Sequence, residues 1–269
     1  MALWCQGFPI VDVPQSDTPK PITLIKPYFE NPRFLAAEMS RFRHYWPDHL
    51  RQQWSLIVVD DVSDHPAEDV LRGADLALKT RLFRMHPPKV RWNWLGARNI
   101  GAHEADDGWL LITDMDHVVP PSTADALVYG KHDPSVVYGF SRRDYTGAPM
   151  EASVVPDSPE QELADSVDRN PHSASFFMTR RMFWTIKGYD ERYSGFYGSD
   201  GPYRRRLARH AKIQILTDRL ICHEKKGDSG TTTFGRKEPY DAGIAKIHAL
   251  VKADPKPKVL SFPYHEVTL

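Results

Sequence analysis

The sequence has no excess of charge of either sign. Its 269 residues include 35 lysines and arginines and 35 aspartates and glutamates, which gives a formal net charge of +0. A protein that binds nucleic acid through bulk electrostatics needs a net basic surface. The balance therefore argues against that class and leaves only a local basic patch open.

Long hydrophobic runs are also absent. The mean hydropathy is −0.50, and no apolar stretch approaches the ~18 residues that a membrane-spanning helix needs. Residues 1–14 lack a basic segment, and their apolar stretch is interrupted by Gln6, Gly7 and Pro9, which is untypical of a signal peptide. We therefore expect no membrane span.

Cysteine is scarce, since Cys5 and Cys222 are the only two. Two cysteines cannot form a disulfide framework, and a reducing cytoplasm is the simplest compartment for such a chain. We therefore expect a cytoplasmic protein. Proline, by contrast, is frequent: the 22 prolines are about 8% of the chain, against a usual ~5%. They are spread along the sequence, which indicates rigid loops rather than disorder.

Segments with the patterns of strands and helices alternate between residues 20 and 140. Apolar runs predict buried strands at 22–26, 55–59 and 109–113. The spacing of apolar residues predicts helices from Pro32, from Pro66 and over 92–105. Continuous apolar strands separated by helices are typical of a parallel sheet that is covered on both faces. The sequence therefore predicts an α/β fold.

Shorter signals complete the pattern. Further strands are predicted at 82–85, 136–138, 174–178 and 212–216. Further helices are predicted from Ser122 and around 244–251. Residues 141–172 are polar and predict a long surface excursion, residues 227–236 predict a mobile loop, and a segment rich in proline and lysine closes the chain.

Acidic residues follow the ends of the predicted strands. Asp60 and Asp61 end one apolar run, Asp114 and Asp116 end another, and Glu30 follows the first. Ligands of doubly wound α/β sheets bind beyond the carboxyl ends of the strands. We therefore expect these carboxylates to lie near a bound ligand.

The Asp114-Met115-Asp116 segment has the spacing of a metal-binding pair. In an extended segment, two carboxylates separated by one residue point to the same side. Hard oxygen ligands suit Mg²⁺ or Mn²⁺, which keep open positions for substrate phosphates. The alternative interpretation is a solvated pair of aspartates in a turn.

Two other sites suit contacts with a nucleotide. The carboxylates of Asp60 and Asp61 can accept from a ring N–H or from ribose hydroxyls, although one of them could instead cap the helix near Pro66. Arg98 lies in a segment of small residues ahead of the two aspartates, and its guanidinium could pair with a diphosphate. The alternative for Arg98 is an ordinary surface position.

Six segments in this order resemble the GT-A glycosyltransferases, especially the family-2-like group. That group carries an I-P-x-Y/F-N segment ending its first strand, then V-D-D-x-S, A-R-N-x-G and D-x-D, and later G-G-F-D-E and G-x-E/D-D. The corresponding segments here are 25–28, 58–63, 96–101, 114–116, 187–193 and 198–203. The resemblance covers residues 20–225.

The resemblance implies a single GT-A domain over residues 1–269. Its fold would be α/β and Rossmann-like, with a mostly parallel sheet flanked by helices. Residues 20–140 would form the nucleotide-sugar-binding half, and residues 141–269 would form the acceptor-binding half with the C-terminal tail.

The resemblance also implies roles for the donor and metal site. Pro27 and Phe29 would wall the nucleoside, and Asp61, beside Asp60, would contact the base. Arg98 would lie near the pyrophosphate. Asp114 and Asp116 would hold a divalent cation, Mn²⁺ or Mg²⁺, that bridges this pyrophosphate, and His223 would complete the metal shell. The alternative for His223 is an ordinary histidine after a strand.

Asp200 is the residue that the resemblance assigns as the catalytic base. The sequence departs from the family pattern here, because Asp200-Gly201 replaces the paired acids. Asp190 and Glu191 therefore stay open as alternative bases. The sequence departs also at Lys187, which replaces the first glycine of G-G-F-D-E, and at residues 26–31, which replace the usual I-P-x-Y/F-N at the end of the first strand.

The implied function is a metal-dependent, inverting glycosyltransferase. The cation would assist departure of the diphosphate, and a carboxylate would take the proton of the attacking hydroxyl. The donor would be a nucleotide-diphospho-sugar, with UDP-sugars first, and the acceptor would be a glycan or a small molecule. Aromatic residues would help to read the acceptor, together with residues 141–172 and 227–236; these aromatics are Trp184, Tyr189, Tyr193, Phe196 and Tyr197.

Three alternatives stay open at this point. Basic residues at 142–143, 180–181, 204–206 and 225–226 could bind DNA that carries hydroxymethylated bases, which would make the chain a DNA glycosyltransferase. A nucleotidyltransferase would show a Gly-rich loop after its first strand, and Lys26-Pro27-Tyr28 is unlike one. A non-catalytic sugar-binding module would not need Asp114, Asp116 and Asp200.

Overall fold

A ten-stranded sheet organises the part of the chain that the computed structural model describes, residues 13–90, 93–145, 167–168, 175–196, 199–224 and 240–269. The strand order is β10-β3-β2-β1-β4-β8-β6-β9-β5, and β7 pairs with β6. The strands are β1 (Ile22–Tyr28), β2 (Trp54–Asp60), β3 (Lys79–Met85), β4 (Trp109–Ile112), β5 (His117–Val118), β6 (Val136–Tyr145), β7 (Val167–Asp168), β8 (Phe176–Thr179), β9 (Lys212–Glu224) and β10 (Tyr264–Val267).

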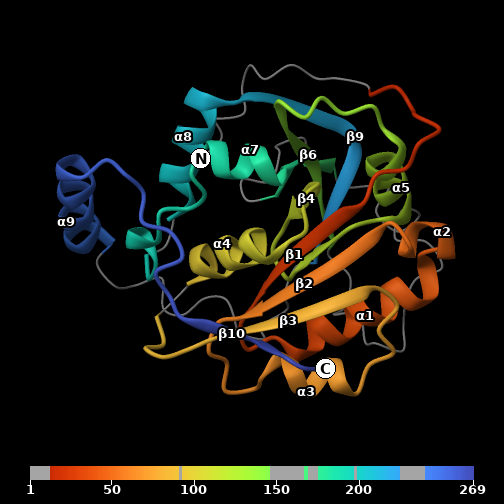
Figure 1. Ribbon diagram of the computed structural model, residues 1–269, viewed down its shortest axis with the longest axis horizontal. Coiled ribbons are helices and arrows are strands. Elements are labelled where there is room, and N and C mark those ends of the chain that lie inside the picture. The colour runs from red at the N-terminus through yellow and green to blue at the C-terminus, as the bar shows by residue number, and fades with distance from the viewer. Residues whose placement is uncertain (1–12, 91–92, 146–166, 169–174, 197–198, 225–239) are drawn as a thin grey trace.

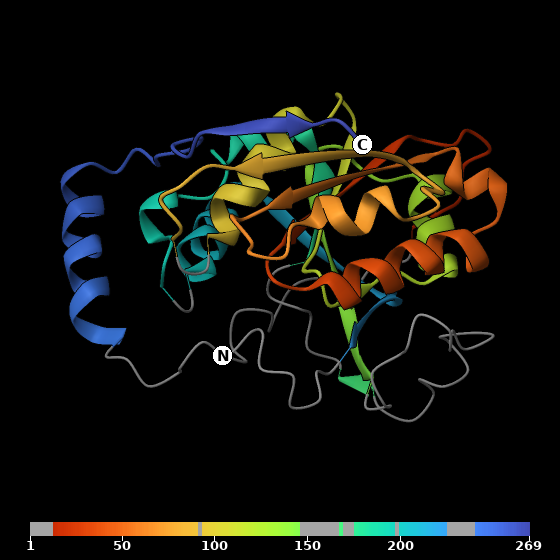
Figure 2. The same ribbon diagram turned by 90° about the horizontal axis from the view of Figure 1, so that it is seen from below.

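Helices cover both faces of this sheet (Figures 1 and 2). They are α1 (Pro32–Tyr45), α2 (Asp48–Arg51), α3 (Ala67–Arg72), α4 (Trp94–Glu104), α5 (Pro121–Tyr129), α7 (Arg180–Thr185), the 3₁₀ helix η1 (Glu191–Tyr193), α8 (Asp200–His210) and α9 (Tyr240–Ala253). In Figure 2, α1 and α3 lie on one side of the sheet and α9 stands at the end of the molecule.

The first half of the sheet is parallel, as the apolar runs predict. Strand β1 lies between β2 and β4 and is parallel to both, and β2 is parallel to β3. Alternate residues of β1 enter different cores: Leu24 and Tyr28 join the core under α1 and α3, whereas Ile25 joins the core under α4. Both faces of β1 are buried, which explains its continuous apolar run.

The second half mixes parallel and antiparallel pairs. Strands β6 and β9 are parallel, whereas β8 runs antiparallel to β4 and to β6. Both β6 and β9 extend well beyond the strands predicted at 136–138 and 212–216. The predicted excursion at 141–172 therefore starts as a strand. The remainder of it, at 146–166 and 169–174, and the predicted loop at 227–236 lie outside the described residues.

Helix α4 approaches β1 closely because it carries small residues. A Cβ atom at Gly101 would collide with the side chain of Ile25, and one at Gly96 would lie 2.9 Å from Phe262. Glycine lets α4 approach β1 at Gly101 and leaves room for Phe262 at Gly96. Arg98 and Asn99 lie between the two glycines: Arg98 pairs with Asp114, which follows β4, and Asn99 donates to the carbonyl of Tyr189 at 2.8 Å.

The end of the chain forms a strand that the sequence pattern did not predict. Residues 264–267 form β10, which pairs antiparallel with β3 at the sheet edge. Arg81 of β3 holds Glu266 of β10 with an Nε···Oε1 distance of 2.7 Å. Among the described residues, no helix combines the length and the apolar character needed to cross a bilayer.

Candidate active site

The predicted acidic residues meet at the carboxyl ends of β2, β1 and β4. Tyr28, the last residue of β1, pairs in register with Asp60, the last residue of β2. On the other side of β1, Ile25 pairs with Ile112, the last residue of β4, and Asp114 follows two residues later. Asp61 and Asp114 therefore flank the end of β1 from its two neighbouring strands.

Asp60 supports the turn that follows β2. Its side chain is buried, Oδ1 accepts from the backbone N–H of Ser63 at 2.9 Å, and Oδ2 accepts from that of Ala67 at 2.9 Å. The second of these bonds satisfies a backbone N–H at the start of α3. This is the capping arrangement that the sequence left open as an alternative, and it engages both oxygens of Asp60.

Asp61 is buried and only partly satisfied. The side chain is 3% exposed, and Oδ2 accepts from the backbone N–H of Asn93 at 3.0 Å. Oδ1 has no hydrogen-bond partner among the described residues. Burial and, to a smaller extent, the neighbouring charge of Asp60 raise the pKa of Asp61 to about 7, against the lowering by the Asn93 N–H and by Lys89. Oδ1 of Asp61 can therefore accept a hydrogen bond from a ligand.

The backbone beside Asp61 is strained. Val62 has φ of +54° and Glu30, across from it on the β1 side, has φ of +46°. A β-branched residue in the left-handed region is a clear outlier, and such strain clusters at binding and active sites. The strained turn holds Asp61 at the edge of the sheet.

Pro27 and Phe29 lie on the exposed side of the end of β1. Both are partly exposed, whereas Tyr28 between them is buried and donates its hydroxyl to the carbonyl of His65 at 2.7 Å. The ammonium of Lys89 lies 5.2 Å from the centre of the Phe29 ring. These two residues are thus accessible next to Asp61.

Asp114, Asp116 and His117 form a compact cluster after β4. One ligand atom from each lies within 4.8 Å of those of the other two. His117 is buried, its Nδ1 is hydrogen-bonded to Ser175 Oγ at 2.8 Å, and its Nε2 lies 4.0 Å from Asp116 Oδ1. A histidine held through one ring nitrogen presents the other in a fixed direction, as metal-ligating histidines do.

The donor set of this cluster fits a divalent cation. Two carboxylates offer the hard oxygens that Mn²⁺ and Mg²⁺ prefer, and an imidazole is compatible with Mn²⁺. Both carboxylates are partly exposed, at 35% for Asp114 and 17% for Asp116, so a ligand can reach them from outside. His117 was not among the predicted ligands, although it directly follows Asp116 in the sequence.

Arg98 lies behind Asp114 rather than at the surface. The guanidinium is fully buried and forms an ion pair with Oδ1 of Asp114. It stacks on the ring of Trp94 at 4.3 Å and donates to the hydroxyl of Tyr189 at 3.3 Å. The structure therefore excludes the ordinary surface position for Arg98. It places the positively charged guanidinium directly against Asp114 of the cluster.

Asp190 and Glu191 are engaged in structural contacts. Asp190 pairs with Arg192 at 2.6 Å and accepts from the backbone of Lys258. Glu191 accepts from Asn99 and from the backbone N–H groups of residues 260 and 261 at 2.8 and 2.6 Å. Both residues are buried. They fasten the segment that leads to β10, and this does not favour either as a catalytic base.

Asp200 and His223 are placed by the backbone. Asp200 is the first residue of α8, and Tyr203, one turn later, stacks on Tyr189 at 3.8 Å. Because Tyr189 contacts Arg98, the first turn of α8 lies two side chains away from Asp114. His223 of β9 stands directly opposite His117 of β5 in the antiparallel register. Both predicted residues are thus carried by elements near the cluster.

The acceptor predictions fare differently. Tyr189 and Tyr193 are buried in the core, so an acceptor cannot stack on them, and this part of the prediction is wrong. Trp184 and Phe196 are partly exposed, and Tyr197 lies outside the described residues. Two of the basic residues that the DNA alternative would use contact the backbone: Arg180 donates to the carbonyls of residues 102 and 103, and Arg206 to those of residues 186 and 188.

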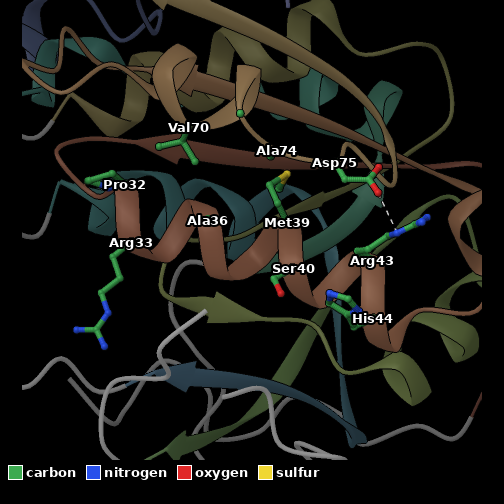
Figure 3. Close-up of a pocket in the computed structure, with 11 residues that line it drawn as sticks. Pro32, Arg33, Ala36, Met39, Ser40, Arg43, His44, Val70, Ala74 and Asp75 are labelled. Atoms are coloured by element: carbon green, nitrogen blue, oxygen red, sulfur yellow. Dashed lines mark ion pairs between the residues drawn. The ribbon is translucent and has the colours of Figure 1, made fainter. Parts of the chain in front are cut away.

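A groove of about 620 Å³ lies elsewhere, between α1 and α3 (Figure 3). Arg43 and Asp75 form an ion pair at its rim with an Nε···Oδ2 distance of 3.0 Å. None of the predicted site residues lines this groove, and its walls include apolar side chains such as Met39 and Val70. It is therefore separate from the acidic cluster.

Two supporting residues were not predicted from the sequence. Asn93 holds Asp61 through its backbone N–H and accepts from Ser194 Oγ at 2.7 Å with its side chain. Lys26 is completely buried and donates to carbonyls of the turn that carries the two aspartates. A polar residue at the end of an otherwise apolar strand was the only available signal for Lys26.

Comparisons with known proteins agree with this geometry. The sequence profile described as "Glycosyl transferase family 2" matches residues 47–189, which is more than half of the chain and includes Asp61, Arg98, Asp114 and Asp116. No curated protein matches the sequence.

Solved structures share the fold at low sequence identity. TarS from S. aureus in complex with UDP-GlcNAc matches with a TM-score of 0.60 and 15% identity, over 87% of this chain and 66% of that one. The mannosyltransferase PcManGT from Pyrobaculum calidifontis, in complex with GDP-Man and Mn²⁺, matches with a TM-score of 0.56 and 16% identity, over 95% of this chain and 70% of that one. GalNAc-T7 with UDP, GalNAc and Mn²⁺ matches with a TM-score of 0.56 and 15% identity, over 87% of this chain and 48% of that one.

The chain thus spans just under two thirds of the length of TarS residues 1–349 and about half that of GalNAc-T7. These likenesses confirm the predicted α/β fold of the GT-A type. Together with the profile match, they confirm the resemblance read from the motifs. The chain belongs to glycosyl transferase family 2, a family of glycosyltransferases.

Proposed function

We propose that the protein is a metal-dependent glycosyltransferase that moves a sugar from a nucleotide-diphospho-sugar to an acceptor hydroxyl. The observation that carries the proposal is the presence of two features on β2 and β4, the strands on either side of β1. One is Asp61, a buried carboxylate with one oxygen lacking a partner among the described residues, and the other is the Asp114, Asp116 and His117 cluster. A nucleoside at the first feature and a diphosphate at the second would span the end of β1.

Asp61 is the proposed contact for the base, between Pro27 and Phe29. Its Oδ2 is engaged by the Asn93 N–H, so Oδ1 is the acceptor that a base can use. Uracil presents a single ring N–H, which matches a single acceptor, whereas guanine presents donors on two adjacent nitrogens. We therefore put UDP-sugars first. Structures similar to this chain contain UDP-GlcNAc, UDP or GDP-Man, so both nucleotides occur within the fold.

Asp114, Asp116 and His117 are the residues proposed to hold a Mn²⁺ or Mg²⁺ ion, with His223 as a further ligand from β9. A bound cation would neutralise charge on the departing diphosphate. Arg98 would support the same site from the protein interior. Its guanidinium pairs with Asp114 and would contribute a positive charge near the diphosphate.

Asp200 is the proposed general base that takes the proton of the acceptor hydroxyl. The contacts of Asp190 and Glu191 support this choice, because both are committed to the C-terminal segment. In-line attack on the anomeric carbon from the face opposite the diphosphate would invert that centre. Asp60 is assigned to the support of the turn and not to the nucleotide.

The acceptor proposed is a hydroxyl of a glycan or a small molecule. A duplex with hydroxymethylated bases is less well supported, because Arg180 and Arg206 donate to backbone carbonyls and do not line a surface for phosphates. A nucleotidyltransferase does not agree with membership of the glycosyl transferase family. The cytoplasmic location stays a prediction.

A screen of nucleotide sugars for hydrolysis in the presence of Mn²⁺ tests the proposal. We expect release of a nucleoside diphosphate from one UDP-sugar, and we expect the release to stop in EDTA and in the Asp116→Asn variant. The Lys20→Met variant, changed at the opposite end of β1, is the matched control and should retain the activity. Equal hydrolysis in EDTA, or in Asp116→Asn, would contradict the metal role.

A further inference from the structure

A lysine is buried beneath the turn that carries the acidic cluster. Lys26 is the fifth residue of the central strand β1, and its side chain is 1% exposed. Its ammonium donates to the backbone carbonyl of Asp114 at 3.2 Å and to that of His117. These two residues begin and end the turn, which is closed by the His117 N–H donating to the Asp114 carbonyl at 3.2 Å.

The charge of Lys26 is compensated from α1. Glu38 Oε1 lies 3.2 Å from the ammonium, and Glu38 Oε2 lies 3.4 Å from a guanidinium nitrogen of Arg41. All three side chains are buried. A buried ion pair of this kind is weak support for stability, because desolvation offsets much of the attraction. Stability alone therefore does not explain why Lys26 and Glu38 are buried together.

The position of the ammonium supplies that reason. Without Lys26, the carbonyls of Asp114 and His117 would each lose a buried charged donor, and the Asp114 carbonyl would keep only the His117 N–H and the Thr113 hydroxyl as donors among the described residues. A hydrogen bond to a charged group contributes about 1.5–3 kcal/mol. The backbone of the turn would then change its conformation to reach other hydrogen-bond donors. Because Asp114, Asp116 and His117 all lie on this turn, such a change would move every residue of the cluster.

We propose that Lys26, held by Glu38, is a positioning residue that fixes the 114–117 turn so that its three side chains converge on one cation. The proposal rests on the proposed function, since it assumes that the cluster binds a metal. Lys26 acts through the backbone of the turn and does not touch the substrate. Partners that orient metal ligands in this way typically contribute about 10–100-fold to metal affinity.

Charge and geometry predict opposite effects, and this makes the proposal testable. A positive charge near a cation site lowers cation affinity, so removal of Lys26 by charge alone would tighten Mn²⁺ binding. Loss of the turn geometry would weaken it. In the double variant Lys26→Met/Glu38→Met, one positive and one negative charge are removed together, so the net charge of the buried group is unchanged. Methionines of similar length replace the Lys26–Glu38 pair with apolar packing, whereas Arg41 keeps its charge and loses Glu38 as a partner.

The experiment measures Mn²⁺ affinity by electron paramagnetic resonance, and stability by thermal unfolding, for four full-length proteins. They are the wild type, Lys26→Met/Glu38→Met, Lys26→Gln and the control Lys20→Met. Lys20 donates to the carbonyls of Leu127 and Val128 at 3.1 Å each, at the C-terminal end of α5. It is thus a lysine with the same kind of contacts at the opposite end of β1.

We expect the double variant to remain folded and to bind Mn²⁺ at least tenfold more weakly than the wild type, and Lys20→Met to lose stability without a change in Mn²⁺ affinity. Wild-type affinity in a folded double variant would overturn the proposal. If the double variant does not fold, Lys26→Gln decides: weaker binding supports the proposal, and equal or tighter binding overturns it. Failure of the wild type itself to bind Mn²⁺ would instead refute the proposed function.

Discussion

Replacing Asp61 with asparagine should make the protein more stable at pH 8 and weaken its binding of uridine. The carboxylate is buried, and its pKa of about 7 lies well above its ordinary value of 3.8. Between these two values the folded state keeps a proton that the unfolded state has lost. The contribution of Asp61 to the free energy of unfolding is therefore most favourable below about pH 4 and decreases as the pH rises through 7.

The size of the effect follows from the pKa difference. Each unit corresponds to about 1.4 kcal/mol, so ionisation of Asp61 lowers the free energy of unfolding by about 4 kcal/mol at pH 8. An asparagine does not ionise, and this part of the destabilisation is absent from the variant. The stability of Asp61→Asn relative to the wild type should thus grow by about 3 kcal/mol between pH 5 and pH 8.

The same substitution should weaken nucleoside binding. Asparagine puts an NH₂ group, which only donates, in the place of one carboxylate oxygen, so it cannot accept from the Asn93 N–H at one position and from a base N–H at the other. A hydrogen bond to a charged group contributes about 1.5–3 kcal/mol, which predicts uridine binding weaker by about 10–100-fold. Uridine is the better probe than UDP here, because it has no phosphate that titrates.

Two assays check the prediction. Urea unfolding of both proteins at pH 5 and pH 8 gives the change in relative stability, and calorimetric titration with uridine at pH 8 gives the affinity. Thr23→Ser, a change at the amino end of β1, serves as the control for both. The account of Asp61 would be refuted by a stability difference that does not change with pH, or by uridine binding equal to that of the wild type.

Three further predictions concern the rest of the site. Asp200→Asn should leave UDP binding intact and lower turnover by at least about 100-fold, as expected for loss of a general base; turnover within a few-fold of the wild type would place the base elsewhere. His223→Ala should weaken Mn²⁺ binding measured by electron paramagnetic resonance, and unchanged binding would leave His117 as the only histidine candidate among the described residues. Glu191→Gln should lower the free energy of unfolding by about 1–3 kcal/mol, because its carboxylate accepts two backbone N–H bonds from the segment before β10; a purely catalytic role would instead lower turnover with no change in stability.

The sequence predicted the parallel half of the fold well, because burial on both faces leaves a direct mark. Strands β1, β2 and β4 are continuous apolar runs, and the acids that follow them lie at one edge of the sheet. The pattern therefore predicts that Asp61 and Asp114 lie at the same edge. It predicts neither the strand order that puts them on either side of β1 nor their individual roles.

What the sequence did not predict depends on contacts between distant segments. Strand β10 is short and half-exposed, and its pairing with β3 has no local signal. Tyr189 and Tyr193 were predicted to help read the acceptor, but packing against Tyr203 and against His248 places them in the interior. Asp60 and Asp61 are adjacent in the chain, yet only the backbone of residues 63, 67 and 93 assigns one to the turn and leaves the other with an open oxygen.

The most direct test of the central claim is an anomalous difference map from crystals grown with UDP and Mn²⁺. The account predicts a manganese peak bound by Asp114, Asp116 and His117, with the uracil ring at Asp61 and the diphosphate between them. A nucleotide in the groove between α1 and α3, or a manganese peak away from the acidic cluster, would contradict it.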